Sequence, residues 1–403
     1  MGIIFSSFNG LEPKIRFPEF NENYKTINLS EYLFENKDRN KSEIYSKQDV
    51  LSVSGEFGIV NQIKLQGRSF AGESVKEYHI VETNDIVYTK SPLKANPYGI
   101  IKVNKGIPGI VSTLYAVYHV KNTAFPEYID YYFSNNLRLN KYLKPLVNIG
   151  AKHDMKVNNE TVLIGCVTFP KVEEQQKIAN FLYLIDQRIE KQRLLVESLK
   201  KYKRGLFLKL YNDSEKSITL FKNIYKMASE GGTPSTLDAE NYENGTIPFI
   251  KIDDLNQHYL ISAKYFITEK GLKKSSAWIV PENSIIYSNG ATIGACSINK
   301  IPVTTKQGIL GIVPKSNFSI EFLYFFFTSS LFKEKIRAIT TKGTMDCAYL
   351  KDINDIKISI PDFTVQQKIS KIMVDFENLI EYTEFSLMHL HNIKKGLLQQ
   401  MFI

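Results

Sequence analysis

The chain has 403 residues, which is enough for two to four domains of ordinary size. Hydrophobic residues make up 43% and charged residues 23% of it, with 22 Gly and 14 Pro, which excludes a collagen-like, largely disordered or disulfide-rich chain. No apolar run reaches the roughly 18 residues of a membrane span, and Cys166, Cys296 and Cys347 lack the spacing of a zinc site. We therefore expect a cytoplasmic protein with no metal and no membrane contact, whose net charge of +9 suits a polyanionic partner.

The first elements in chain order are short strands. Residues 1–24 form a lead segment, and residues 25–169 hold short alternating apolar runs between Gly, Pro and Asn. The last of these runs ends at Pro170, which cannot continue a strand ladder and is well placed just ahead of a helix. The sequence therefore predicts a first globular domain over 25–169.

Residues 170–212 carry the strongest pattern in the chain, a heptad seam. Its positions alternate four and three residues apart and are apolar except at Gln192 and Lys203. A spacing of 3.5 residues kept over about four heptads predicts a helix that coils around a partner helix. The stretch 171–211 also has 10 basic and 5 acidic residues, the densest positive excess in the sequence. The expected contact residues are Ile178, Leu182, Ile185, Ile189, Val196 and Leu199.

A second globular domain is predicted over 217–360 and a second helix over 361–403. The motif Pro-x-x-x-x-Gln-Gln-Lys-Ile begins at Pro170 and returns at Pro361, a shift of 191 residues, and Lys-(Arg/Lys)-Gly-Leu begins at Lys203 and at Lys394. Such self-similarity indicates a tandem duplication. The expected contact residues of the second helix are Ile369, Met373, Phe376, Ile380, Leu387 and Leu390.

Two arrangements of these helices are open. Each apolar stripe could pack on its own domain, or the two helices could pair with each other. Polar residues at matching seam positions, Gln192 and Thr383, favour pairing, because an antiparallel pair would set them opposite each other and fix the register.

The two globular regions correspond to each other only loosely. Asn84-Asp85-Ile86-Val87-Tyr88 resembles Asn283-Ser284-Ile285-Ile286-Tyr287, and each predicts a turn that leads into a strand. The stretches 103–105 and 298–300 both predict a hairpin-like turn, and 127–133 and 321–327 a buried aromatic helix. A shared framework with diverged loops suits two similar domains that recognise different things.

This arrangement resembles the DNA specificity subunit of Type I restriction-modification systems. The resemblance rests on the opening Pro13-Lys14-Ile15-Arg16-Phe17-Pro18-Glu19-Phe20, on the two repeated helix motifs, and on Gly231-Gly232-Thr233-Pro234-Ser235 followed by Ile247-Pro248-Phe249-Ile250. Two departures are mild. The family's opening motif is usually followed by Trp, where this chain has Tyr24, and the first domain lacks a Gly-Gly-Thr-Pro loop.

The resemblance implies an α+β fold with two globular mixed α/β target recognition domains, separated by two long helices that form an antiparallel coiled coil related by an internal pseudo-twofold repeat. It implies that each domain reads half of a bipartite asymmetric site on double-stranded DNA. It further implies that the helices dock two methyltransferase subunits, with restriction or motor subunits joining through the complex. S-adenosylmethionine, ATP and Mg would then be bound by the partner subunits, and no cofactor by this chain.

Residues that could carry catalysis are not convincing. Asn96-Pro97-Tyr98 is similar to the Asn-Pro-Pro-Tyr loop of adenine methyltransferases, but the second proline and a glycine-rich turn for the methyl donor are missing. Asp253 and Asp254 lack a third carboxylate for a nuclease site, and no phosphate-binding loop or hydrolase motif is present. We therefore expect no catalytic residue. A self-contained methylation or restriction enzyme and a coiled-coil scaffold that binds only proteins remain the alternatives.

Candidate DNA contacts are loop residues that can approach phosphates or read base edges. For each of them, a loop residue that merely faces water is the alternative. In the first domain they are Ser54, Arg68, Lys90, Ser91, Lys94, Asn96, Tyr98, Lys152 and His153. In the second domain they are Gly232, Thr233, Ser235, Lys251, Ser288, Asn289, Thr305, Lys306, Gln307 and Lys342.

Overall fold

The protein forms two compact units. The computed structural model describes residues 4–5, 12–149, 155–255, 257–290, 292–341 and 346–403. Unit 1 consists of residues 1–192 with 386–403, and unit 2 of residues 193–385. Each unit thus includes part of both long helices, and the domain limits expected from the sequence stay a prediction. Among the described helices, none is both long and apolar enough to cross a membrane.

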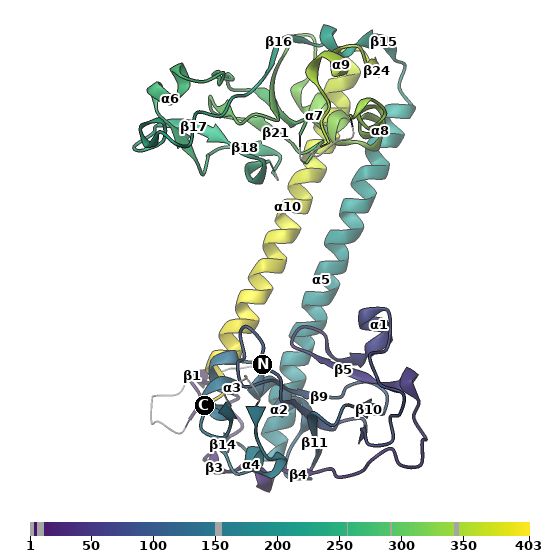
Figure 1. The fold of residues 1–403 in the computed structure, drawn as a ribbon, viewed down its shortest axis with the longest axis vertical. Helices are drawn as coiled ribbons and strands as arrows, with labels where there is room; N and C mark the ends of the chain where they lie inside the picture. The colour runs from purple at the N-terminus through teal and green to yellow at the C-terminus, as the bar shows by residue number, and fades with distance from the viewer. Residues whose placement is uncertain (1–3, 6–11, 150–154, 256, 291, 342–345) are drawn as a thin grey trace. The chain divides into compact units, whose positions relative to one another are not determined.

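Unit 1 is built on a four-stranded antiparallel sheet of order β4-β11-β8-β9 (Figure 1). Its aromatic helix α2 begins at Pro126, as its sequence predicts, and six of its eight residues are buried. The elements are β1 (Ile4–Phe5), β2 (Ile15–Arg16), β3 (Lys25–Asn28), β4 (Leu33–Glu35), β5 (Leu51–Ser54), β6 (Gly58–Asn61), α1 (Gln62–Gln66), β7 (His79–Val81), β8 (Ile86–Thr89), β9 (Ile101–Val103), β10 (Gly109–Val111), β11 (Tyr115–Val120), α2 (Pro126–Phe133), α3 (Asn136–Leu143), β12 (Asn148–Ile149), β13 (Met155–Lys156), α4 (Asn159–Leu163) and β14 (Cys166–Phe169).

Unit 2 repeats this plan with one strand added. Its main sheet has the order β16-β23-β20-β21-β18, in which β18 pairs parallel to β21 and the other pairs are antiparallel. The elements are β15 (Ser217–Leu220), β16 (Tyr225–Glu230), β17 (Ile247–Ile250), β18 (Tyr259–Leu260), β19 (Phe266–Ile267), α6 (Glu269–Lys273), β20 (Ser284–Ser288), β21 (Cys296–Asn299), β22 (Thr304–Thr305), β23 (Ile309–Pro314), α7 (Ile320–Thr328), α8 (Ser330–Ile339), α9 (Leu350–Asn354) and β24 (Lys357–Ile360).

The turns ahead of β8 and β20 show why the two sheets agree. Asn84 has φ 75° and Asn283 has φ 58°, the left-handed conformation that asparagine tolerates better than most residues. The Asn84 N–H donates to the Asn104 carbonyl and the Asn283 N–H to the Asn299 carbonyl, each at 2.8 Å. Both pairs of similar segments predicted from the sequence therefore lie in the same hairpin of their units.

The long helices are α5 (Val172–Asn212) and α10 (Phe363–Gln400), and within each unit the parts of the two helices lie side by side (Figure 1). Every described seam position on both helices is buried or half-buried, as the heptad pattern predicts. In unit 2, Lys203 of α5 pairs with Glu377 of α10, and in unit 1 Lys394 of α10 pairs with Asp186 of α5 at 2.5 Å. The late part of each helix thus meets the early part of the other, which is antiparallel pairing. The alignment of Gln192 with Thr383 remains a prediction.

An aromatic side chain at or just after the end of each long helix packs in a globular core. In unit 2, Tyr211 of α5 lies 5.7 Å from the Phe326 ring of α7. In unit 1, Phe402 lies 5.1 Å from the ring of Tyr128 and 6.0 Å from that of Tyr132 on α2. Because buried aromatic rings contribute large apolar areas, each long helix is a structural part of the unit in which it ends.

Candidate nucleic-acid interface

Three loops of unit 2 pack together after strands β16, β20 and β22. A Cβ on Gly231 would lie 2.0 Å from the Thr305 carbonyl oxygen, and one on Gly232 would lie 2.3 Å from Ser276 Oγ. The Gly308 N–H donates to Glu230 Oε1 at 2.7 Å. The two glycines therefore allow the loops to pack closely. From the sequence alone, this role could not be distinguished from that of glycines in an ordinary turn.

Several predicted contact residues of this cluster are buried. Ser288, Asn289 and Thr305 are fully enclosed, and Gly232 is also buried. Asn289 Nδ2 donates to the Ala348 carbonyl at 3.1 Å, and Thr305 Oγ1 donates to the Ile309 carbonyl at 3.1 Å. The Asn289 and Thr305 side chains hold the loops in place, so we assign these two residues to positioning. None of the buried residues can reach DNA unless the loops rearrange.

The solvent-facing candidates of unit 2 lie in the same loops as these buried residues. Thr233, Ser235, Lys306 and Gln307 are exposed. The Gln307 N–H donates to Thr233 Oγ1 at 3.4 Å, which places the loops after β16 and β22 next to each other. These side chains combine a cation, an amide and hydroxyls on one surface, a set that can bind phosphate and read base edges.

The other candidates of unit 2 lie apart or are not described. Lys251 is half-buried, with its Nζ 3.5 Å from the centre of the Tyr265 ring. Asp253 is exposed and accepts a hydrogen bond from Tyr265. Its hydrogen bond to its own backbone, together with the Lys264 cation, holds its pKa below the usual range. Lys342 lies outside the described residues. In the part of the chain that is described, no group of three His, Cys, Asp or Glu residues could hold a metal.

In unit 1 the corresponding candidates follow β8, the strand equivalent to β20. Ser91 and Lys94 are exposed. Lys90 is half-buried; its burial lowers its pKa, and the nearby Arg39 charge lowers it further. Asn96 is buried and its Nδ2 donates to Asn136 Oδ1 at 3.1 Å. Tyr98 is half-buried against the core. Of the candidate residues in this loop, Ser91 and Lys94 are therefore the most exposed.

The β5–β6 hairpin and the loop after α1 carry one further candidate each. Ser54 ends β5, and its Oγ accepts hydrogen bonds from the Glu56 and Phe57 N–H groups at 3.2 Å. Phe57 at the tip is exposed, a feature that sequence reasoning missed. Arg68 is exposed, with its guanidinium 4.6 Å from the centre of the Phe70 ring. Lys152 and His153 lie outside the described residues.

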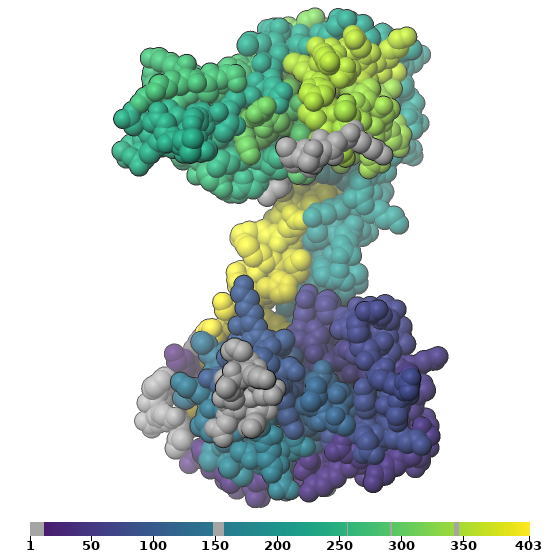
Figure 2. Space-filling model, in the orientation of Figure 1, coloured from purple at the N-terminus to yellow at the C-terminus, as the bar shows by residue number. Residues whose placement is uncertain are grey.

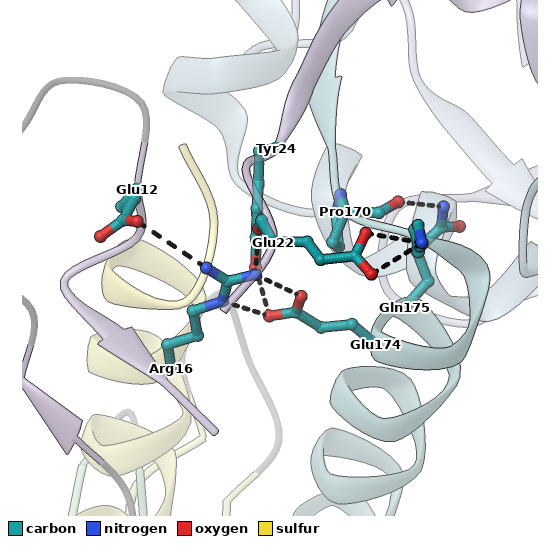
Figure 3. A network of polar contacts seen from close by, with 8 residues as sticks. Glu12, Arg16, Glu22, Tyr24, Pro170, Glu174 and Gln175 are labelled. Atoms are coloured by element: carbon teal, nitrogen blue, oxygen red, sulfur yellow. Dashed lines mark hydrogen bonds and ion pairs between the residues drawn. The ribbon is translucent and has the colours of Figure 1, made fainter. Parts of the chain in front are cut away.

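The lead segment is joined to the first long helix by a buried charge network (Figure 3). Arg16 Nε and Nη2 donate to the Glu174 carboxylate at 2.9 and 2.8 Å. Tyr24 O–H donates to Glu174 Oε1 at 3.0 Å, and burial together with that carboxylate raises the pKa of Tyr24. The hydrogen bond that Arg16 donates to Glu174 raises the pKa of Arg16 as well. Tyr24, which stands where the family motif usually has Trp, thus takes part in the network that links the lead segment to α5.

Each unit has a cleft, lined by both basic and acidic side chains, where a long helix meets the aromatic helix. The clefts have volumes of 660 Å³ in unit 1 and 430 Å³ in unit 2. Lys394 lies 5.7 Å from the centre of the Tyr131 ring, and Lys203 lies 5.9 Å from that of Phe325. The basic side chains of the first cleft are Lys102, Lys105, His391, Lys394 and Lys395, and those of the second are Lys200, Lys203 and Arg204.

Comparisons with known proteins agree with these features. Residues 221–388 match a family model described as the Type I restriction modification DNA specificity domain. The chain is 34% identical over 163 residues to the Type I restriction enzyme MjaIX specificity subunit of Methanocaldococcus jannaschii, covering 40% of this chain and 37% of that protein. The family-model match, the curated relatives and the solved structures all indicate a Type I restriction-modification DNA specificity subunit.

Other specificity subunits are similar over parts or most of the chain. The EcoR124I/EcoR124II specificity subunit of Escherichia coli is 29% identical over 153 residues, covering 37% of this chain and 38% of that protein. These alignments span less than half the length of both curated relatives. The crystal structure of the S subunit from M. genitalium shares the fold at a TM-score of 0.54 with 17% identity, covering 97% of this chain and 99% of that one.

A second solved structure also shares the fold, and its description concerns the structural basis of complex assembly of the type I R-M system. Its TM-score is 0.59 with 14% identity, and it covers 94% of this chain and 97% of that chain. At such identity the likeness concerns the architecture alone. The specificity-subunit fold of two mixed α/β units with paired long helices, expected from the sequence, is therefore confirmed.

Proposed function

We propose that this chain reads a two-part asymmetric site on double-stranded DNA, with one unit recognising each half-site. The observation that carries this proposal is the contrast between a repeated sheet and unrepeated loops. Strands β4-β11-β8-β9 and β16-β23-β20-β21 have the same order, whereas the loops after β8 and β20 differ in length and sequence. Two domains that read different DNA sequences would be expected to keep a common framework while their loops diverge.

The exposed loop residues supply the chemistry for recognition. Lysine and arginine bind phosphates, whereas glutamine and hydroxyl side chains can pair with base edges in the major groove. In unit 2 we assign these roles to Thr233, Ser235, Lys306 and Gln307. In unit 1 we assign them to Arg68, Ser91 and Lys94.

The proposal includes the partners of the chain. Two methyltransferase subunits would dock on the long helices, and restriction or motor subunits would join through that complex. The assembly would methylate adenine from S-adenosylmethionine and, with ATP and Mg, cut unmodified DNA. These cofactors would be held by the partners, and this chain would contribute recognition and positioning.

An exchange of recognition regions tests the proposal. Residues 25–169 are replaced by the equivalent region of a relative, the chain is expressed with its methyltransferase subunit, and the methylated sequences are read from the host genome. We expect one half-site to change and the other to stay. A change in both half-sites would contradict independent reading by the two units.

Two measurements on the purified chain separate this function from its alternatives. Salt-dependent retardation of duplex DNA is expected, because Lys and Arg contacts release counterions from the phosphates. Absence of such binding would favour a scaffold that binds only proteins. Tight binding of S-adenosylmethionine by the chain alone would favour a self-contained methyltransferase.

A further inference from the structure

Glu230 is a carboxylate within the loops of unit 2 that the proposed function assigns to DNA. It ends β16, and its Oε1 accepts a hydrogen bond from the Gly308 N–H at 2.7 Å. Gly308 follows Gln307, whose own N–H donates to Thr233 Oγ1. Figure 2 shows that teal, green and yellow-green segments, which are far apart in the sequence, share the surface of unit 2 on the face in view. Glu230 therefore lies next to two of the residues proposed to contact DNA.

The backbone around Glu230 has little freedom. Gly308 has φ 85°, a conformation that other residues rarely adopt, and an ideal Cβ on Gly290 would lie 3.3 Å from the Gly308 Cα. The Gly231 N–H donates to the Ile309 carbonyl at 2.9 Å. One carboxylate oxygen is thus held by a charge-assisted hydrogen bond from a fixed backbone, whereas Oε2 accepts no hydrogen bond from the described residues.

The negative charge of Glu230 is not neutralised inside unit 2. Among the residues that the structure describes, no lysine, arginine or histidine forms an ion pair with it, although its side chain is half-buried. A neighbouring side chain responds to that charge. Burial raises the pKa of the Cys347 thiol, and the Glu230 charge raises it further. A ligand that offers a hydrogen-bond donor would compensate the charge.

Glu35 is the corresponding residue of unit 1 and provides a contrast. It ends β4, which has the same place in its sheet as β16. Its Oε1 accepts a hydrogen bond from Asn159 Nδ2 at 2.6 Å, and its Oε2 lies 3.7 Å from Lys37 Nζ. Both oxygens of Glu35 therefore have partners within their own unit, whereas Glu230 keeps one oxygen for a partner outside the chain.

A carboxylate suits few of the groups that DNA presents. An ionised carboxylate only accepts hydrogen bonds, and it repels the phosphates. In the major groove guanine and thymine present acceptors, adenine presents an amino group beside the N7 acceptor, and cytosine presents the N4 amino group. Cytosine is therefore the base that best satisfies Glu230, and an acceptor in its place would leave the half-buried charge unpaired.

We propose that Glu230 is a specificity-determining residue, which accepts a hydrogen bond from the N4 amino group of one cytosine in the half-site read by unit 2. This inference rests on the proposed function and deepens it by naming a base. Because Gln307 is adjacent to Glu230 through Gly308, the cytosine should belong to the base pair that Gln307 contacts or to a neighbouring one. Lys306 in the same loop would hold the phosphates and offset their repulsion of the carboxylate.

The variant Glu230→Gln tests the inference, because its amide oxygen can still accept the Gly308 N–H while the charge is lost. The chain is expressed with its methyltransferase subunit, and the methylated sequences are read from the host genome. The half-site of unit 2 is the one that stays when residues 25–169 are exchanged. The original chain should require cytosine at one position of it. The variant should use adenine there at least roughly tenfold more often, since glutamine can pair with adenine N6 and N7.

A control variant and a modified duplex separate base reading from a structural role. Glu243→Gln removes an exposed carboxylate from the same unit and should leave every position of the site unchanged. In a synthetic duplex, the cytosine is replaced by 2-pyrimidinone, which lacks the amino group. Binding of the original chain should weaken roughly 10- to 100-fold relative to the same replacement in the spacer between the half-sites. Glu230→Ala should bind both duplexes equally.

Each remaining outcome decides between the two proposals. If the original chain neither binds duplex DNA nor directs methylation, the proposed function itself fails. If it does both, but the half-site of unit 2 has no G·C pair or Glu230→Gln keeps the original site, the inference fails while the proposed function stands. A change at the same position in Glu243→Gln also overturns the inference. If Glu230→Gln does not fold, the modified duplex is decisive, because unweakened binding of the original chain to it excludes a contact with the amino group.

Discussion

Gln175 and Gln366, 191 residues apart, make the same pair of hydrogen bonds in their respective units. Each side-chain Nε2 donates to the carbonyl of the proline five residues earlier, at 2.9 and 2.8 Å. Each Oε1 accepts from the N–H of the residue that precedes an aromatic helix, Phe125 before α2 and Ser319 before α7, at 2.9 Å. This glutamine fixes the start of a long helix against the globular core, which accounts for its place in the repeated motif.

Replacing Gln175 with Leu should destabilise unit 1. The change leaves the half-buried Phe125 N–H and the buried Pro170 carbonyl without their Gln175 partner, and such losses cost about 1–3 kcal/mol. The free energy of unfolding, measured in urea, should fall by that amount. Gln176→Leu alters the neighbouring exposed glutamine and should leave the value almost unchanged. Equal effects of the two substitutions would show that the paired hydrogen bonds do not matter.

Removal of one partner from the Arg16–Glu174 pair should cost more than removal of both. Glu174→Leu alone leaves the Arg16 guanidinium buried without its carboxylate, and breaking a buried pair in this way costs about 3–5 kcal/mol. The double variant Arg16→Met with Glu174→Leu removes both charges and should recover part of that loss. Urea unfolding of the two single variants and the double variant gives the coupling energy. A coupling near zero would contradict the network of Figure 3.

The sequence predicts the parts of this fold that depend on local pattern and repetition. The heptad seam fixes which residues of the helices are buried, and the Asn84 and Asn283 turns fix the start of two equivalent strands. Both signals are short-range in the chain. They also appear twice, so that each copy supports the interpretation of the other.

The remaining features depend on contacts between distant residues. Arg16 and Glu174 are 158 residues apart, and no spacing pattern connects them. Ser288, Asn289 and Thr305 have polar side chains that suggest a surface loop, yet they are buried because the convergence of three loops gives several of their polar groups backbone partners. Composition alone cannot separate a polar residue that faces DNA from one that holds a loop.

A charge placed in the seam should separate the long helices. Ile189 and Ile380 are both buried, and replacing both with Asp would enclose two unpaired carboxylates, at a cost of several kcal/mol. Methyltransferase assembly should be lost, and the melting temperature should fall. The control carries Asp at Leu184 and Leu379, which are exposed positions on the same helices. Unchanged assembly and melting temperature in the seam variant would rule out the paired helices.

Lys306 and Gln307 should affect DNA binding in different ways. Lys306→Ala removes a phosphate contact, so affinity should fall for all sequences and the salt dependence should weaken by about one ion. Gln307→Ala removes a base-edge contact, so discrimination at one base pair of one half-site should fall by about 1–3 kcal/mol. Gel retardation at several salt concentrations measures both effects. Lys273→Ala alters an exposed lysine on α6 and serves as the control. An equal loss of DNA affinity in this control would contradict the assignment of DNA contacts to the loop that carries Lys306 and Gln307.

His258 should make the stability of unit 2 depend on pH. Its ring lies between those of Tyr259 and Tyr324, at centroid distances of 3.9 and 4.2 Å. Burial lowers its pKa to about 4, and the charges of Lys203 and Lys300 contribute. Its pKa in an unfolded chain is about 6.5.

The sign follows from proton binding in the two states. Between pH 6.5 and 4 the unfolded chain holds a proton on this histidine that the folded chain does not, so the free energy of unfolding falls as the pH is lowered through that window. Its contribution is complete above pH 6.5, and the loss by pH 4 is at most about 3 kcal/mol. His258→Phe keeps a ring between the two tyrosines but cannot take up a proton, so the difference in unfolding free energy between variant and original chain should grow as the pH falls. His389→Phe, at an exposed position on α10, should show no such trend. A difference that stays constant from pH 7 to pH 4.5 would mean that His258 is already accessible to protons in the folded unit.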